Sequence, residues 1–333
     1  MNPTSPQPSK SSPGRSPRAS KAQHKLRWVL AHEPPAVFEA ASAQFVEELK
    51  ETTSGAFDVE LFLGREYAEA QNLPGLSRRA LVEKVARGEI EMAHCYVSAL
   101  GEFHDSLWAV ELPFLFRDYE HAERFFEGSL ARKIMNDMRP TGLRGLSFAY
   151  SGGYRIVPTL GKELRSLADY RGLTIRTAGN PVPEAMYASL GAKAIGADLE
   201  GIPKMVRDGR IDGCEITYVR FKAAELDDVF DTVNETGHSL FTTMTVVNEE
   251  WFRSLSDAHQ AAIHDATLAS CRTERRTAIG EESAMSVRCA EQGLNIVKMD
   301  DARHAELRTA SQAMYREFTP RFGEALIEGI REA

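Results

Sequence analysis

The chain has 333 residues, of which 43% are hydrophobic, so it can bury the cores of two domains of ordinary size. Its formal net charge of -8 at pH 7 argues against a nucleic-acid-binding surface. No run approaches the roughly 18 consecutive apolar residues that a membrane-spanning helix needs.

Residues 1–25 are rich in Ser and Pro, and their charged side chains are all basic. We predict that this segment is disordered, because it cannot bury apolar surface. It also lacks the apolar stretch of a secretory signal. We therefore expect either a cytoplasmic protein or an exported precursor that starts elsewhere.

The next hundred residues alternate between strand and helix patterns. Phe38, Ala41, Phe45 and Leu49 fall at helical spacing, for example. The predicted strands are 26–31, 57–63 and 90–96, with a helix before the second strand and another, ending at Gly88, before the third. This βαβαβ order predicts parallel strands joined by right-handed crossovers.

A second βαβαβ unit is predicted in residues 169–217. Its elements are a strand at 173–176, a helix at 183–190, a helix at 199–207 and a strand that follows 210–213. Arg176 and Glu215 lie at the carboxyl ends of these strands, where parallel sheets bind small ligands. Two such units predict two lobes with a cleft between them.

The other predicted elements connect or follow these units. They are a helix within 111–126 with Asp118 as its N-cap, strands at 145–150, 229–233, 242–248 and 294–299, a flexible joint at 151–155, a turn or short helix at 166–169, and two C-terminal helices. A long helix is predicted at 257–292, capped by Ser256. At 1.5 Å per residue it would be roughly 50 Å long, enough to span both lobes, with a bend near Gly280.

Motifs for catalysis or metal binding are not found in the sequence. It contains no GxSxG, P-loop or HExxH pattern and no GxGxxG. The four cysteines show neither CxxC nor zinc-site spacing, so we expect free thiols or small core residues: Cys95, Cys214, Cys271 and Cys289. We therefore predict a protein that is not an enzyme and uses no metal or cofactor.

Four blocks together resemble the substrate-binding proteins of TRAP (tripartite ATP-independent periplasmic) transporters. They are LPFLFRDYEHA at 112–122, GGYRIVPT at 152–159, GLTIRTAGNPV at 172–182 and RDGRIDGCE at 207–215. The resemblance implies an α/β, two-lobed periplasmic-binding-protein fold with a hinge, a ligand cleft and a long helix spanning both lobes. It also implies a periplasmic, monomeric receptor that delivers a small organic acid to membrane permease subunits.

The resemblance also assigns roles to single residues. The arginine that pairs with the ligand carboxylate falls on Arg176, and a second ligand-binding arginine falls on Arg155. An acidic residue that contacts zwitterionic solutes falls on Glu33, which follows His32. We divide the chain into the segment 1–25, lobe I with 26–152 plus 239–279, and lobe II with 153–238 plus 280–333.

Three features depart from the family pattern. The usual DGQEN sequence is DGCEI here, so Cys214 replaces the glutamine and Ile216 replaces the asparagine that binds the ligand. Gly201 stands where a glutamate is usual, with Glu200 one residue away, and 67–79 is a longer insert. These changes leave the carboxylate anchor in place and leave the ligand open.

Each candidate also has a purely structural interpretation. Arg176 could form an ion pair with Asp198, Glu200 or Glu215, and Arg155 could be an exposed charge at the hinge. Glu33 could cap the next helix, and Asn180 could shape the turn before Pro181 or reach the ligand. The remaining candidates are wall residues of lobe I, aromatic residues that could belong to the core, and a histidine where the chain recrosses the hinge: Tyr96 and Ser98, Tyr218 and Phe241, and His238.

Two functions stay open at this point. The first is a transport receptor for an organic acid, and the second is a sensing or scavenging protein of the same fold without a transporter. Two arginines favour an acid with a second polar or anionic group, such as a dicarboxylate, a sugar acid or a 2-oxo acid. Glu33 would favour a solute with a cationic group, and Ile216 would tolerate an aromatic or branched acid.

Overall fold

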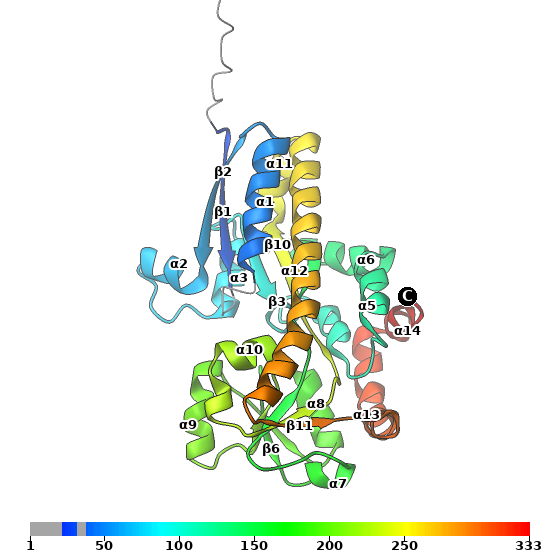
Figure 1. Cartoon of the computed structure of the whole chain (residues 1–333). Helices are drawn as coiled ribbons and strands as arrows, with labels where there is room; N and C mark the ends of the chain where they lie inside the picture. The colour runs from blue at the N-terminus through cyan, green and yellow to red at the C-terminus, as the bar shows by residue number, and fades with distance from the viewer. Residues whose placement is uncertain (1–21, 32–37) are drawn as a thin grey trace, which may run out of the picture.

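The computed structural model describes residues 22–31 and 38–333, and these residues form two lobes, each built on its own sheet (Figure 1). Lobe I holds a five-stranded sheet in the order β2-β1-β3-β10-β4. Lobe II holds a six-stranded sheet in the order β11-β9-β5-β8-β6-β7. The two-lobed α/β fold expected from the sequence is therefore confirmed.

The elements follow the predicted order closely. The strands are β1 (His24–Leu30), β2 (Phe57–Leu63), β3 (Met92–Tyr96), β4 (Leu143–Tyr154), β5 (Val157–Thr159), β6 (Thr174–Thr177), β7 (Lys193–Gly196), β8 (Gly213–Cys214), β9 (Thr232–Glu235), β10 (Leu240–Asn248) and β11 (Asn295–Lys298). The main helices are α1 (Glu39–Thr52), α2 (Gly64–Ala70), α3 (Arg78–Ala86), α5 (Tyr119–Phe126), α6 (Ser129–Asp137), α8 (Pro181–Ser189), α9 (Ile202–Arg207), α10 (Tyr218–Ala223), α12 (Asp257–Glu291), α13 (Asp301–Phe322) and α14 (Glu324–Glu332). Shorter helical turns are α4 (Val97–Leu100), η2 (Asp105–Glu111), η3 (Arg139–Thr141), α7 (Leu167–Tyr170), η4 (Leu199–Gly201), η5 (Leu226–Asp228) and α11 (Glu249–Ser254).

Both predicted βαβαβ units pair in parallel. β1 pairs with β2 and β3, and β6 pairs with β7 and β8, all parallel. The sheets as a whole are mixed, because β10 runs antiparallel to β3 and β4, and β5 runs antiparallel to β8 and β9. β10 is buried along its whole length, as expected for a strand with a neighbour on each side and helices on both faces.

One predicted feature is wrong. Residues 151–155 do not form a loop-like joint, because β4 continues through Gly152 and Gly153 to Tyr154. Tyr154 pairs with Leu240 of β10 across a β-bulge, and both glycines have positive φ. The glycines thus redirect a paired strand as it leaves lobe I, which no local pattern shows.

The chain passes between the lobes along β4, along the return from β9 to β10, and along α12. Ser256 caps α12 by accepting a hydrogen bond from the backbone N–H of His259, 3.3 Å away. α12 packs on β4 and α1 of lobe I and on α10 and β11 of lobe II. Figure 1 shows it running past both sheets, with a change of direction in its orange part. The predicted spanning helix is confirmed.

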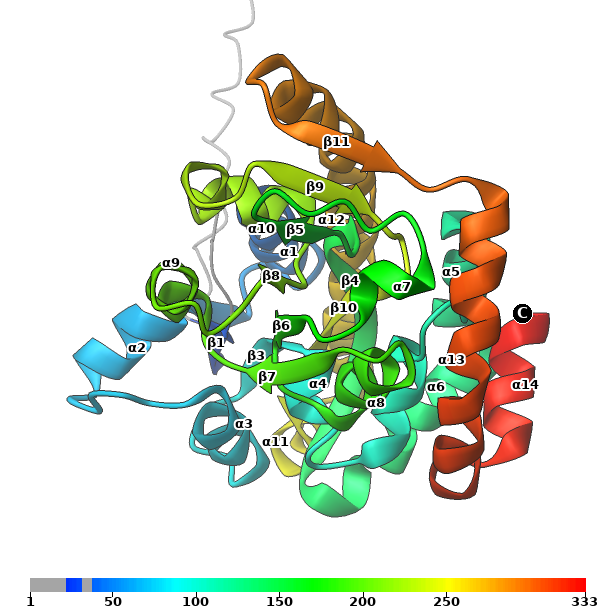
Figure 2. The same cartoon turned by 90° about the horizontal axis from the view of Figure 1, so that it is seen from below.

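The C-terminal helices lie along the side of both lobes (Figure 2). α13 packs on α8 of lobe II and on η2 of lobe I, and α14 packs on α6 and η2. The division of the chain at residue 280 stays a prediction.

The four cysteines are free and buried, as expected. None of the helices in the described part combines the length and apolar character that crossing a membrane requires.

The glycine pair in β4 generates a first prediction. Gly153 has φ +89°, and a Cβ added there would collide with the Tyr119 hydroxyl and the Glu282 carboxylate. Gly161 has φ +66° with no atom within 4 Å of an added Cβ. We expect Gly153→Ala to lower the free energy of unfolding by about 3 kcal/mol and Gly161→Ala by only about 1 kcal/mol. Urea unfolding of both variants tests this, and equal losses would contradict it.

Candidate functional site

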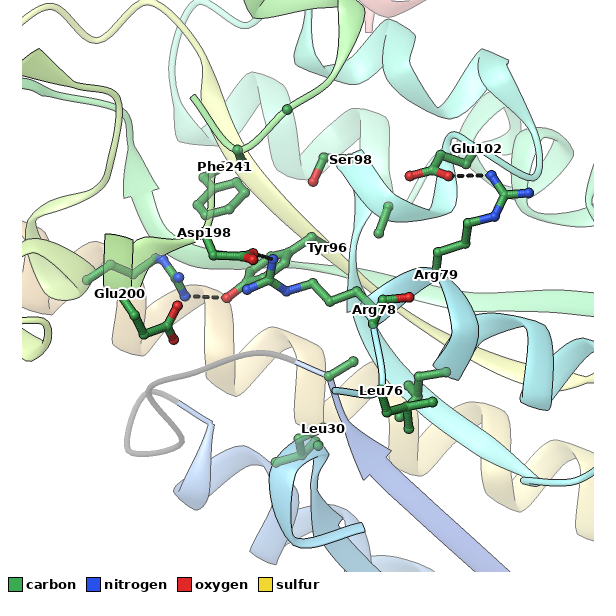
Figure 3. Close-up of a pocket in the computed structure, with 18 of the residues that line it drawn as sticks. Leu30, Leu76, Arg78, Arg79, Tyr96, Ser98, Glu102, Asp198, Glu200 and Phe241 are labelled. Atoms are coloured by element: carbon green, nitrogen blue, oxygen red, sulfur yellow. Dashed lines mark hydrogen bonds and ion pairs between the residues drawn. The ribbon is translucent and has the colours of Figure 1, made fainter. Parts of the chain in front are cut away.

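A cavity of about 680 Å³ lies between the two lobes (Figure 3). Lobe I contributes the ends of β1 and β3, the start of α3 and the start of β10. Lobe II contributes the ends of β6 and β8 and the start of α10. The side chains that matter for its chemistry are Arg78, Tyr96, Ser98 and Phe241 from lobe I, and Arg155, Arg176, Glu215, Ile216 and Arg220 from lobe II or its border.

Arg176 ends the apolar strand β6 and lines this cavity, with only 6% of its surface exposed. Its Nε donates to the carbonyl oxygen of Ala197 at 2.7 Å, and Nη1 lies 3.5 Å from that of Glu215. Within residues 22–31 and 38–333, no carboxylate lies within 4.0 Å of this guanidinium, so the alternative of an internal ion pair is not realised there. Backbone carbonyls orient the side chain without neutralising it.

Arg155 lies in a buried ion cluster, so the alternative of an exposed hinge charge is wrong. Its Nη2 donates to Oε1 of Glu111 at 3.2 Å. Its Nη1 lies 2.7 Å from Oε1 of Glu215, an ion contact without hydrogen-bond geometry. The guanidinium also stacks 4.0 Å from the centre of the Phe241 ring. Arg155 therefore borders the cavity while carrying two carboxylate partners.

The two carboxylates of this cluster have opposite pKa shifts. Burial alone would raise the pKa of Glu215, but Arg155 and then His238 outweigh burial and lower it to about 2. Burial raises the pKa of Glu111 to about 7. The positive charge of Arg155 opposes this effect, and the negative charge of Glu215 adds to it. Glu215 is therefore the ionised partner of Arg155, and Glu111 can hold a proton near neutral pH.

His238 and Asn180 support the cluster from the side away from the large cavity. His238 places Nε2 3.1 Å from Oε2 of Glu215 and Nδ1 2.7 Å from the Thr236 hydroxyl. Asn180 caps α8 by accepting from the N–H of Val182 at 2.9 Å, and its amide donates to Glu111 at 2.6 Å. The oxygen and the nitrogen of the Asn180 side-chain amide thus both have hydrogen-bond partners within the protein, which favours the structural interpretation of this residue.

The aromatic candidates divide into two groups. Tyr96 and Phe241 stack with their ring centres 4.9 Å apart and line the cavity beside Ser98. Tyr218 is a core residue instead, since its hydroxyl donates to Glu235 at 2.8 Å and its ring lies in the lobe II core. Glu33 and His32 lie outside the described residues.

Two cavity arginines were missed in the sequence. Arg220 lies on α10, donates to the Tyr96 hydroxyl and places its guanidinium 5.0 Å from that ring's centre. Arg78 begins α3 at the end of the insert 67–79 and lies 5.3 Å from the same ring centre. Figure 3 shows Arg78 reaching Asp198 across the cleft, at 3.3 Å. The available signal for Arg220 was a cation within the apolar run YVRF, the same kind of signal that identified Arg176.

Among the described residues that line the cavity, arginines outnumber carboxylates. Burial lowers the pKa of Arg176, and the positive charges of Arg220 and Arg155 lower it further, while Cys214 and Glu215 oppose them. Burial raises the pKa of the Cys214 thiol to about 12, so it stays protonated and is a poor nucleophile. In the described part of the chain, no group of three or more His, Cys, Asp or Glu side chains could hold a metal ion.

The shifted pKa of Glu111 predicts a pH effect on stability. A pKa raised from 4.5 to about 7 means that the folded protein binds the proton more tightly, so this contribution is complete below pH 4.5 and is lost as the pH rises to about 7. Between pH 5 and 7.5, the free energy of unfolding should fall by about 2 kcal/mol less in Glu111→Gln than in the wild type. Burial also raises the pKa of Glu282 to about 7, so the unfolding free energy of this variant should still fall somewhat as the pH rises.

Urea unfolding at pH 5 and 7.5 measures this difference. The control is Glu250→Gln, which removes an exposed carboxylate and should leave the slope as in the wild type. An unchanged slope in Glu111→Gln would show that Glu111 is ionised throughout this range.

Comparison with known proteins places this site in context. A family model for bacterial extracellular solute-binding proteins, family 7 (DctP), matches residues 31–321. A solute-binding protein of Verminephrobacter eiseniae is 26% identical over 290 residues, which are 87% of this chain and 83% of that protein. The sialic acid-binding periplasmic protein SiaP of Vibrio cholerae is 22% identical, over 76% of this chain and 77% of its own.

Solved structures show the same fold. A TRAP periplasmic solute-binding protein of Roseobacter denitrificans with bound β-D-glucuronate has a TM-score of 0.80 and 22% identity, covering 92% of this chain and 99% of that chain. One from Bordetella with density assigned to pantoate has a TM-score of 0.82 and 22% identity, covering 93% and 99%. The match over residues 31–321 decides the family: this chain belongs to the bacterial extracellular solute-binding proteins of family 7, the DctP-type substrate-binding proteins of TRAP transporters.

Proposed function

We propose that this protein reversibly binds a small organic acid between its lobes, with Arg176 as the carboxylate anchor, and delivers it to a TRAP permease in the membrane. The observation that carries the proposal is the Arg176 guanidinium. It is buried, it lines the cavity, and its hydrogen-bond partners in the described residues are backbone carbonyls. A periplasmic location and a monomeric state belong to the same proposal.

The electrostatics of the cavity support an acid as the ligand. Burying a guanidinium costs free energy unless an anion compensates, and Arg220 and Arg155 add to the positive potential at Arg176. A carboxylate relieves this cost, since a planar guanidinium can bind both of its oxygens. The charge of Arg155, in contrast, is already balanced by Glu215. Arg155 therefore shapes the wall of the site, and Arg176 supplies the anchor.

The position of the cavity supports capture by lobe closure. Its walls come from both sheets, and the chain links the lobes through β4, the β9–β10 return and α12. A ligand that contacts both walls favours the closed arrangement over the open one by the free energy of these contacts. No chemical step is needed for this function.

Related proteins support the ligand class. Relatives are described as binding sialic acid, 2,3-diketo-L-gulonate and C4-dicarboxylates, and a structural neighbour holds D-erythronate. Each of these ligands is an organic acid. This shared property, together with the cavity arginines, supports an acid here as well. Ile216, where the family has asparagine, removes one polar contact and favours a ligand that is apolar at that point.

A thermal-shift screen of small organic acids tests the anchor. An acid that raises the melting temperature of the wild type should bind roughly a hundredfold more weakly to Arg176→Ala, because the variant leaves the carboxylate buried without a partner. Arg176→Lys keeps the charge but loses two-point binding, so its affinity should be intermediate. Arg207→Ala removes an exposed arginine of the same lobe and should bind as the wild type does. Undiminished binding to Arg176→Ala would refute the anchor.

A further inference from the structure

Two of the three segments that join the lobes are tied together by the carboxyl group of Glu282. This residue lies on α12, which changes direction in its orange part as it passes between the lobes (Figure 1). Its Oε2 accepts a hydrogen bond from the hydroxyl of Tyr119, on α5 of lobe I. That hydroxyl accepts from the backbone N–H of Tyr154, 3.2 Å away, at the end of β4. Tyr119 therefore connects α12 to β4 where both leave lobe I.

Gly153 leaves the space that this contact needs. It precedes Tyr154 in β4, and a Cβ added to it would collide with the Tyr119 hydroxyl and with Oε2 of Glu282. Its φ of +89° is one that residues with a Cβ rarely adopt. The hydrogen-bonded pair thus lies directly against the backbone of β4. A movement of α12 relative to β4 must displace this pair.

A second carboxylate ties the third segment to the same helix. Glu235 ends β9, from which the chain returns to β10. Its Oε1 accepts from the hydroxyl of Ser286 on α12 at 2.6 Å and from that of Tyr218 on α10 at 2.8 Å. Ser286 follows Glu282 by four residues, so the two contacts lie about one turn apart on the same side of α12. All three connections between the lobes therefore meet at this part of α12.

The described groups that face Glu282 are acidic or phenolic. They are Tyr119 from α5, Tyr154 from β4 and Glu235 from β9, and Asp118 acts on Tyr154. No basic side chain in the described part of the chain forms an ion pair with Glu282. Burial raises the pKa of Glu282 to about 7. The hydrogen bond from Tyr119 and the backbone N–H of Tyr154 oppose this effect, and the charge of Glu235 adds to it.

We propose that Glu282 is a proton switch in the hinge, which makes the relative position of the two lobes depend on pH. In its neutral form the carboxyl group accepts the hydrogen bond of Tyr119, and α12 stays against β4. In its ionised form a negative charge stands near Glu235 with no cation to offset it. Ionisation then favours an arrangement in which α12 moves away from β4 and water reaches the carboxylate. The switch acts without a ligand and so goes beyond the proposed function.

Fluorescence energy transfer between the lobes tests the switch in the ligand-free protein. Dyes on Glu47→Cys of α1 and Arg207→Cys of α9, two exposed positions, report the distance between the lobes, and the four native cysteines are buried. As the pH rises from about 5.5 to about 8.5, the transfer efficiency should change in one step with its midpoint near pH 7. Glu282→Gln should keep the low-pH efficiency throughout, because its side chain stays neutral. A wild type without this step would overturn the inference.

A second variant tests the hydrogen bond itself. Tyr119→Phe removes a bond that lowers the pKa of Glu282, so the midpoint of the step should move up by about one pH unit. An unchanged or lower midpoint would contradict the role of Tyr119 and overturn the switch as proposed. Circular dichroism and the melting temperature establish that the variants fold. If Glu282→Gln does not fold, the midpoint in Tyr119→Phe carries the test.

Two controls assign the step to Glu282. Glu111→Gln should retain the step whatever its absolute efficiency, although the pKa of Glu111 is also raised to about 7. Glu291→Gln removes an exposed carboxylate of the same helix and should leave the midpoint unchanged. A step that persists in Glu282→Gln, or that disappears in Glu111→Gln, would assign the titration to another group and overturn the inference. Each of these outcomes leaves the proposed acid receptor untouched.

Discussion

The ion cluster of Arg155 is the interaction on which the lobes, the hinge and the binding wall depend together. Arg155 follows β4 as the chain leaves lobe I, and its backbone pairs with the returning segment: its N–H donates to Ser239, 2.9 Å away, and its carbonyl accepts from Gly237 at 3.1 Å. Its side chain joins Glu111 of lobe I to Glu215 of lobe II. In a buried cluster of this kind, the attraction between the charges offsets the cost of removing them from water only when every partner is present. Losing one partner lowers the free energy of unfolding by about 3–5 kcal/mol.

The same cluster explains why Arg176 has backbone carbonyls rather than a carboxylate as its partners among the described residues. Glu215 lies beside Arg176, because β6 pairs with β8 and the N–H of Glu215 donates to the carbonyl of Arg176 at 2.8 Å. Glu215 would be the natural partner of Arg176, yet its carboxylate oxygens already face Arg155 and His238. Arg155 thus fixes the wall of the cavity through paired charges, whereas Arg176 lines the cavity with backbone partners, as its proposed role of carboxylate anchor requires. Two arginines at similar depth therefore have different roles, and the difference lies in their partners.

Local patterns predicted what depends on neighbours in the sequence. Strand β2, the Asp118 cap and the length of α12 all follow from residues close in the chain, and the cation that ends an apolar strand identified Arg176 as a pocket residue. The features that were missed depend on contacts between distant residues. Tyr96 lies 124 residues from Arg220, and Glu111 lies 69 residues from Asn180. The glycine pair in β4 was misjudged for the same reason, because its partner is β10.

Closure of the cleft is weakly supported by the protein alone. Arg78 and Asp198 face each other across the mouth, with 37% and 79% of their side chains exposed, and such pairs contribute only about 0–1 kcal/mol. Deeper in the cleft, burial lowers the pKa of Arg220, and the positive charges of Arg78 and Arg155 lower it further. In the proposed function, an anion bound between the walls offsets the repulsion among these cations and so favours the closed arrangement. Under the proposed function, acid binding and closure of the cleft are therefore coupled, as expected of a receptor that binds its ligand reversibly.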